Sequence, residues 1–190
     1  MLSKFSQPII ATLWSVVQRV GGISISFISN IILARLLFPE DFGTIGLIIV
    51  FSSLADTLVD AGLGSALIQK NKITKHDIST VYTINVFFSV FLFSLIYILS
   101  PFFADYIGID NFAIYLRVQV LTILLRALYV VEFSLLNRRL RFKDLAQINV
   151  VASFFSSAIA ITFAYMGYGI WSLIIKNISL QLILVVLYKY

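Results

Sequence analysis

The sequence predicts an all-α integral membrane protein, a bundle of six transmembrane helices, and three observations support this fold class. Of the 190 residues, 60% are hydrophobic and only 12% are charged, about half the charge of an ordinary soluble domain. The mean hydropathy is +0.99. Apolar segments of about 20 residues, the length that crosses a bilayer, recur along the chain. We therefore expect lipid to be the solvent for most of the surface.

Six apolar segments are long enough to span a membrane, and they define one membrane domain over residues 1–190. The N-terminal MLSKFSQPII is too short and too mixed for a cleavable signal peptide, so we interpret it as the start of the first span. No linker or second domain is expected. The predicted spans cover residues 9–37, 42–68, 78–104, 112–136, 145–166 and 170–188.

Helix-start and turn residues separate these spans. Pro39, followed by two acids, suits the start of the second helix, because a fixed φ and negative charge both fit a helix N-terminus. Thr74 and Asp77 have the spacing of a capping box ahead of the third apolar run. The sequence GYG at 167–169 predicts a tight turn between the last two helices.

The charged residues indicate the orientation of the bundle. One set of helix ends is basic and the other is largely acidic, so the positive-inside rule places the basic ends and both termini in the cytoplasm. This separation accounts for the net charge of +5 without a nucleic-acid partner. Docking of an RNA or a protein remains the alternative role for the basic clusters. The basic ends carry Lys4, Lys70, Lys72, Lys75, Arg138, Arg139, Arg141, Lys143 and Lys189, and the other ends carry Arg35, Glu40, Asp41, Asp105 and Asp110.

Polar residues form a stripe on three of the spans when the helices are plotted at 100° per residue. In the second span, Asp56 and Asp60 lie one turn apart and share a face. The stripes are Ser15, Gln18, Arg19, Gly22, Ser26, Ser29 and Asn30 in the first span; Gly46, Ser53, Asp56, Thr57, Asp60 and Gly64 in the second; and Tyr115, Gln119, Thr122, Arg126, Tyr129 and Asn137 in the fourth.

The other polar positions are interpreted differently. The third span is expected to face lipid, and the fifth has a face of small residues suited to close helix packing. Lys176, Asn177 and Gln181 of the sixth span are predicted not to share one face. Arg117 is expected to reach the lipid headgroups. Gly21–Gly22 permits either a bend in the first span or close packing against a neighbour.

Four stripe charges are expected near the middle of the membrane, counting 1.5 Å per residue from the cytoplasmic ends. A lone charge at that depth costs at least ~2.5 kcal/mol, so the stripes should face one another inside the bundle. Two interpretations remain open: the charges form ion pairs that hold the helices together, or they line a hydrated cavity that accepts a substrate. The candidate substrate-cavity residues are Gln18, Arg19, Asp56, Asp60, Gln119 and Arg126.

The sequence does not point to an enzyme. The single histidine, His76, lies in a predicted cytoplasmic loop, and the chain has no cysteine. Neither paired histidines nor a thiolate is available for a metal site or a nucleophile. We therefore predict no catalytic residue, no metal and no cofactor.

Five stretches resemble the polysaccharide-export flippases. They are LARLLFPEDFG (33–43), DAGLGSALIQK (60–70), ITKHDISTVYTIN (73–85), RRLRFKDLA (138–146) and GYGIWSLI (167–174). They occur in order over essentially the whole chain. The resemblance is to the Wzx-type lipopolysaccharide and teichuronic-acid biosynthesis proteins of the multidrug/oligosaccharidyl-lipid/polysaccharide exporter superfamily.

This resemblance implies a fold and an activity. Such proteins have two six-helix lobes around a central cavity, and this chain resembles the N-terminal, MATE-like lobe alone. They move undecaprenyl-pyrophosphate-linked oligosaccharide across the bacterial inner membrane for cell-surface polysaccharide such as O-antigen. The resemblance implies that Arg19 and Arg126 meet the pyrophosphate and that Asp56 and Asp60 serve ion coupling.

The partners implied are membrane lipid, the lipid-linked oligosaccharide and a second six-helix lobe. Two other functions remain open. The chain could be a structural or assembly subunit of a polysaccharide export complex that transports nothing itself. It could also be a lobe of an ion-coupled drug efflux protein.

Overall fold

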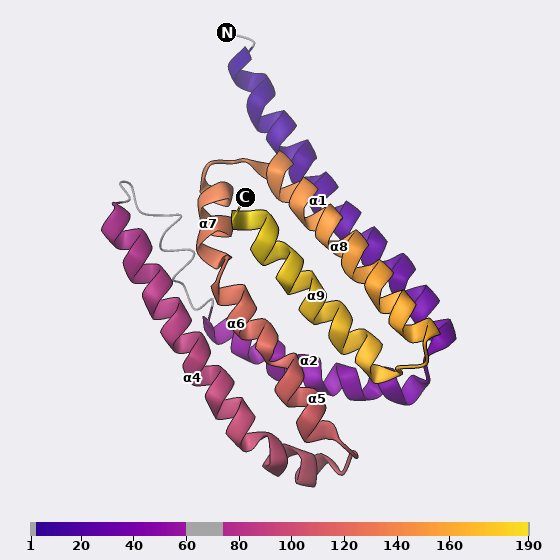
Figure 1. The fold of residues 1–190 in the computed structure, drawn as a ribbon. Helices are drawn as coiled ribbons and strands as arrows, with labels where there is room; N and C mark the ends of the chain where they lie inside the picture. Colours follow the sequence, from indigo (N-terminus) through magenta and orange to yellow (C-terminus); the bar gives the residue numbers. More distant parts are fainter. Residues whose placement is uncertain (1–2, 60–73, 190) are drawn as a thin grey trace.

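The protein is an all-α bundle wherever the structure describes it. The computed structural model describes the backbone of residues 3–59 and 74–189, and the side chains of 20–59, 74 and 76–189. All regular secondary structure in these ranges is helical, so the all-α prediction is confirmed (Figure 1). The helices are α1 (Ser3–Leu36), α2 (Pro39–Val59), α4 (Lys75–Ile107), α5 (Phe112–Gln119), α6 (Leu121–Ala127), α7 (Val130–Arg138), α8 (Phe142–Tyr165) and α9 (Ile170–Lys189).

Helix α9 lies at the centre of the bundle. Helix α8 packs along one side of it, and α1 packs along the other side of α8. Helices α5 and α6 lie on the opposite side of α9, and α4 packs outside them (Figure 1). Helix α2 crosses between these groups and contacts α9, α5, α6 and α4. Helices α1 and α2 therefore diverge from their shared junction at residues 36–39.

Small residues allow α1 and α8 to approach closely. Ala160 of α8 is fully buried in a cluster with Leu33 of α1, and Ser156 is 1% exposed. A Cβ atom added to Gly21 would lie 3.1 Å from Cγ2 of Val150, which is tighter than most real contacts. Helix α1 continues unbroken through this position. The arrangement favours close packing over bending as the role of this glycine.

The predicted helix boundaries at the turns are confirmed. Helix α2 begins at Pro39, and the Asp41 carboxylate accepts a hydrogen bond from the Phe38 N–H at 3.2 Å. Thr74 and Asp77 form the reciprocal capping box that begins α4. The GYG turn uses left-handed backbone at both of its glycines, with φ of 81° and 53°. Only glycine adopts this conformation at no steric cost.

The number of spans is confirmed only in part. Within the described residues, four helices are long and apolar enough to cross a membrane, and a fifth span is counted if a bent pair is one span. Helix α1 contributes the shorter apolar segment Val20–Leu36. Six spans therefore stay a prediction.

The fourth predicted span is not the straight helix that the apolar run suggested. It divides into α5, α6 and α7, and the last of these is bent by 45° from the others. Tyr129 stands at the break, with φ −127° and ψ −7°. Its hydroxyl donates to Oε1 of Gln181 at 2.7 Å, and its ring stacks on Tyr188 with centroids 5.1 Å apart. These contacts with α9 stabilise the break.

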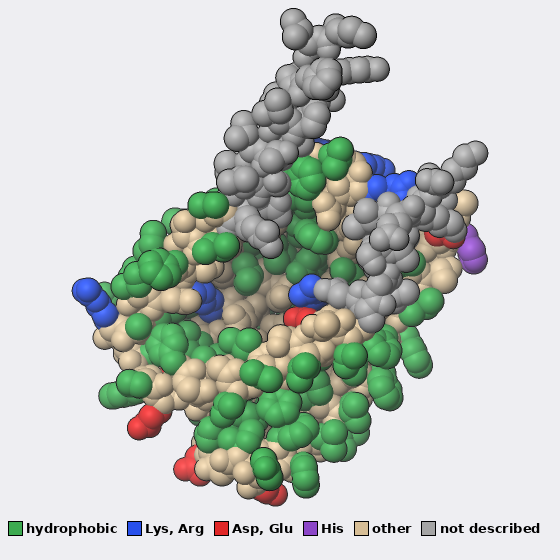
Figure 2. All heavy atoms as spheres, turned by 180° about the vertical axis from the view of Figure 1, so that it is seen from behind, with side chains coloured by type: hydrophobic (Ala, Val, Ile, Leu, Met, Phe, Trp, Pro, Cys, Tyr) green, Lys and Arg blue, Asp and Glu red, His purple; other side chains and the backbone are tan. Residues whose placement is uncertain are grey.

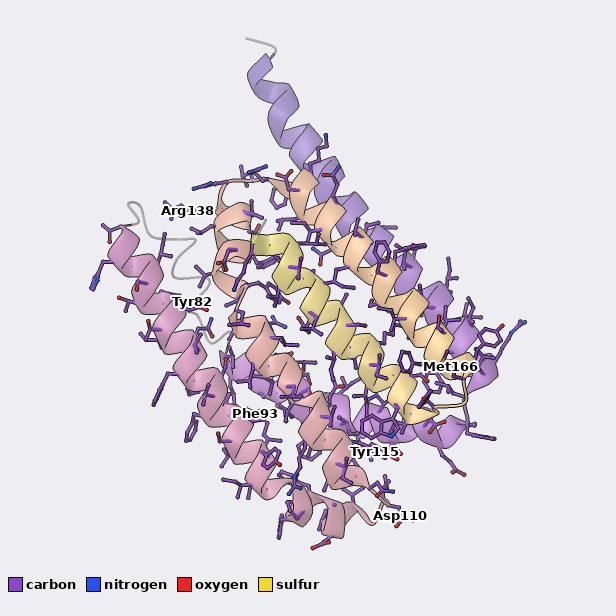
Figure 3. All side chains as sticks on the ribbon, viewed as in Figure 1. Tyr82, Phe93, Asp110, Tyr115, Arg138 and Met166 are labelled. Atoms are coloured by element: carbon purple, nitrogen blue, oxygen red, sulfur yellow. The ribbon has the colours of Figure 1, made fainter. Side chains whose placement is uncertain are left out.

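Charge separates along the bundle, and one face of α4 is apolar. Arg138 and Asp110 lie at opposite ends of the molecule (Figure 3). The outer face of α4 exposes large apolar side chains, including Phe87, Ile98 and Phe102, as expected for a helix that faces lipid. Its inner face buries Asn85 and Ser89 against the bundle.

Candidate substrate groove

An ion pair joins the second and fourth predicted spans. Nη1 of Arg126 lies 3.5 Å from Oδ2 of Asp56. Asp56 is in the last described turn of α2, and Arg126 is in the last turn of α6, just before the break. Their side chains are 24% and 31% exposed, respectively, so the pair is open to its surroundings on one side. Asp56 thus points toward the fourth span, as expected for the stripes to face one another, and the same expectation for Asp60 lies outside the described residues.

The ion pair borders a polar cavity. Asp56 lines a cavity of about 180 Å³ between α2, α5, α6 and α9. Gln119 is only 3% exposed, and its Oε1 accepts a hydrogen bond from Nδ2 of Asn177 at 3.3 Å. The lining residues are Ile49, Ser52, Ser53, Asp56, Gln119, Thr122, Asn177, Leu180 and Gln181.

A second cavity of about 280 Å³ adjoins the first and is lined by α1, α2, α8 and α9. The two cavities share Ile49, Asn177 and Leu180, and together we call them the α9 groove. At its α1 side, Nζ of Lys176 donates to Oδ1 of Asn30 at 2.7 Å. Figure 2 shows this back face of the molecule hollowed, with charged side chains in the hollow and hydrophobic ones around it.

Three of the six predicted cavity residues lie near one another. Asp56 and Gln119 line the same cavity, and Arg126 pairs with Asp56. The other three predicted residues are not described. Gln18 and Arg19 lie in the part of α1 whose side chains are outside the described set, and Asp60 lies outside the described residues altogether.

The sixth span contributes three polar side chains to the α9 groove. Lys176 lines only the cavity beside α1, Gln181 lines only the cavity beside α5 and α6, and Asn177 lines both. Asn177 and Gln181 are four residues apart and therefore neighbours on one helix face. That spacing was the signal available in the sequence.

Arg117 also differs from its predicted role. Its Nε donates to Oγ of Ser100 at 2.7 Å, and its guanidinium carbon lies 4.6 Å from the centre of the Tyr97 ring. The side chain thus packs against α4 within the bundle. The expectation that it reaches the headgroups stays a prediction.

The groove offers polar contacts of several kinds. An ammonium, a carboxylate, amides and hydroxyls lie along it, and the Arg126 guanidinium pairs with the carboxylate. Within the described ranges, no group of three or more His, Asp or Glu residues is placed to hold a metal ion. The polar groups that line the groove can form hydrogen bonds and ion pairs with a polar molecule.

These features define a class of protein, a helical membrane protein with a charged, polar groove among its spans. The chain belongs to the polysaccharide biosynthesis protein family, whose model matches residues 32–190. This result confirms the resemblance drawn from the sequence motifs. No solved structure matches the chain.

Three relatives illustrate the family. The chain is 29% identical over 161 residues to the succinoglycan biosynthesis transport protein ExoT of Rhizobium meliloti (strain 1021), covering 85% of this chain and 33% of the relative. It is 31% identical to an uncharacterized membrane protein in the cps region of Klebsiella pneumoniae, covering 73% and 28%. It is 27% identical to the teichuronic acid biosynthesis protein TuaB of Bacillus subtilis (strain 168), covering 67% and 26%. The chain thus spans a third or less of the length of these relatives.

Proposed function

We propose that this chain is the N-terminal lobe of a flippase that moves undecaprenyl-pyrophosphate-linked oligosaccharide across the bacterial inner membrane. In this proposal it has six spans and cytoplasmic termini, and a second six-helix lobe completes the transporter. The relatives named for succinoglycan transport and teichuronic acid biosynthesis support a role in polysaccharide export. The observation that carries the proposal is the Arg126–Asp56 pair beside an open polar groove.

The geometry favours a substrate path over a purely structural ion pair. A structural pair is best sealed from water, because exposed pairs contribute little to stability. Here both side chains remain partly exposed, and hydroxyl and amide groups continue the polar surface away from them. Such a surface suits the hydroxyl groups of a sugar.

Arg126 is assigned to the pyrophosphate. A guanidinium binds phosphate oxygens in a bidentate manner and stays charged when buried. Asp56 would hold Arg126 in place while the groove is empty and would take up a proton or Na⁺ during the cycle. Gln18, Arg19 and Asp60 would extend the same polar surface, and Gln119 would contact the sugar.

The test uses the complete transporter, with both lobes, in cells that depend on it for export. Protein level and export of the lipid-linked sugar are measured for Arg126→Gln and for Arg126→Gln combined with Asp56→Asn. Arg117→Gln is the matched control, because this arginine lies outside the groove. The proposal expects normal protein level and lost export in both Arg126 variants. Recovery of both level and export in the double variant would make the pair structural and would refute the phosphate role.

A further inference from the structure

A third cavity lies at the basic end of the bundle, apart from the α9 groove. It has a volume of about 460 Å³, within the range of small-molecule sites. It is enclosed by α7, the loop after it, the start of α8 and the end of α9. Its lining includes charged side chains and a tyrosine: Glu132, Arg139, Arg141, Asp144, Lys189 and Tyr188.

The cavity carries both signs of charge. Nε of Arg141 donates to Oδ2 of Asp144, so these two charges offset each other. The remaining charged groups are two cations, Arg139 and Lys189, and one carboxylate, Glu132.

Glu132 is the unexplained member of the group. Its Oε2 is buried, and within the described part of the chain it has no hydrogen-bond partner. A buried carboxylate oxygen without a donor is costly, and the native structure normally supplies one. Glu132 lines the cavity, so a cationic group bound beside this side chain would supply the missing donor.

The position of the cavity indicates what kind of ligand it binds. It lies at the end of the bundle that carries Arg138 (Figure 3), and Lys189 and Tyr188 are in its wall. Basic and aromatic residues gather at the level of the lipid headgroups. An anion alone would be repelled by Glu132, and a cation alone would meet two positive side chains.

We propose that this cavity binds a phosphoethanolamine group, with the ammonium against Glu132 and the phosphate against Arg139 and Lys189. Its source is the headgroup of an aminophospholipid in the adjoining leaflet. This inference concerns a lipid that stays bound to the protein and does not depend on the proposed transport function.

The test compares two lipids on the protein purified from its membrane. Binding of phosphatidylethanolamine and phosphatidylglycerol is measured by native mass spectrometry for the wild type, Glu132→Gln and Arg139→Gln. Glu132→Gln should weaken phosphatidylethanolamine binding about tenfold, because a charge-assisted hydrogen bond is lost. The same change should leave phosphatidylglycerol binding unchanged or stronger, because a repulsive charge is removed. Arg139→Gln should weaken both.

The control for charge alone is Asp110→Asn, an exposed acid at the other end of the bundle, which should leave both lipids unaffected. Soluble glycerophosphoethanolamine should displace the lipid from the wild type if the headgroup is recognised. Failure of this displacement would mean that the acyl chains carry binding and would overturn the proposal. Equal binding of the two lipids, or phosphatidylethanolamine binding unchanged in Glu132→Gln, would overturn it as well.

Discussion

Two contacts of residues that line the α9 groove, those of Asp56 and Lys176, involve charges in different ways. Between α6 and α2, Arg126 faces the carboxylate of Asp56 at 3.5 Å. Between α9 and α1, the ammonium of Lys176 donates to the neutral amide oxygen of Asn30 at 2.7 Å. In the described ranges, no carboxylate forms an ion pair with Lys176.

The two contacts differ in the net charge that remains once they have formed. An ion pair offsets both charges and links two helices, so losing one partner exposes the other. An amide satisfies one N–H donor but leaves the positive charge in place. The Asp56–Arg126 contact should therefore behave as a link between helices, and the Lys176 contact as a site that still attracts an anion.

The largest effect is expected for Arg126→Gln. Removing the guanidinium takes away the proposed phosphate ligand, so export should be lost; because the pair is partly exposed, the free energy of unfolding should fall by only about 1 kcal/mol. Adding Asp56→Asn should recover this stability, measured by unfolding in mixed detergent, and should leave export lost. Arg35→Gln is the control, since this exposed arginine lies at the end of α1. A double variant no more stable than Arg126→Gln would contradict the pairing.

A smaller effect is expected for Gly21→Leu, which disturbs the close packing of α1 on α8 that brings Asn30 to the groove. The new side chain would clash with Val150, because its Cβ alone would already lie 3.1 Å from Cγ2 of that valine. Overpacking of this kind costs about 2 kcal/mol. Gly22→Ala is the matched control, because its Cβ would lie 3.9 Å from the nearest atom, an ordinary contact. Thermal unfolding should separate the two variants, and equal stability would show that α1 and α8 are not closely packed here.

Asn30→Ala should have a weaker effect still. It removes the acceptor from the Lys176 ammonium and should cost about 1 kcal/mol. In a Lys176→Met background the same change should cost almost nothing, because no donor is left to satisfy. A double-mutant cycle on the unfolding free energy measures this difference. A cost that is the same in both backgrounds would show that the hydrogen bond is not formed.

The orientation of the bundle in the membrane can be tested with single cysteine substitutions, which are expected to leave its stability unchanged. The chain has no cysteine, so single cysteines report their own side of the membrane. A thiol at Asp110→Cys should react with an impermeant reagent in intact cells, and one at Arg139→Cys only after the cells are opened. This result would place the Lys176 contact, in the second turn of α9, nearer the outer leaflet. The reverse labelling pattern would show that the bundle has the opposite orientation in the membrane.

Local chemistry made the helix boundaries predictable. Pro39 fixes its own φ, the Thr74–Asp77 pair satisfies N–H groups at its own helix start, and the GYG turn needs glycine. Each of these causes lies within a few residues of its effect, so each is visible in the sequence. The Asp56–Arg126 pair was predictable for a related reason, because helical periodicity places each residue on a polar face of its helix.

Long-range contacts made the rest unpredictable. The break at Tyr129 has no glycine or proline beside it, and it depends on Gln181 and Tyr188, about 50 positions along the chain. Helix propensity alone favours a continuous helix there. The polar side chains of α9 are a different case, because the four-residue spacing of Asn177 and Gln181 is visible in the sequence.

The bend in the fourth span also determines how that span fits the thickness of the bilayer. Drawn out straight from Phe112 to Arg138, it would measure about 40 Å, against a hydrocarbon layer of about 30 Å. Bending is one of the ways in which a long span adapts to this mismatch. The angle of 45° takes up part of the excess length. A thicker or thinner membrane should therefore change this angle first, and Tyr129 would carry that change to Gln181 in the wall of the groove.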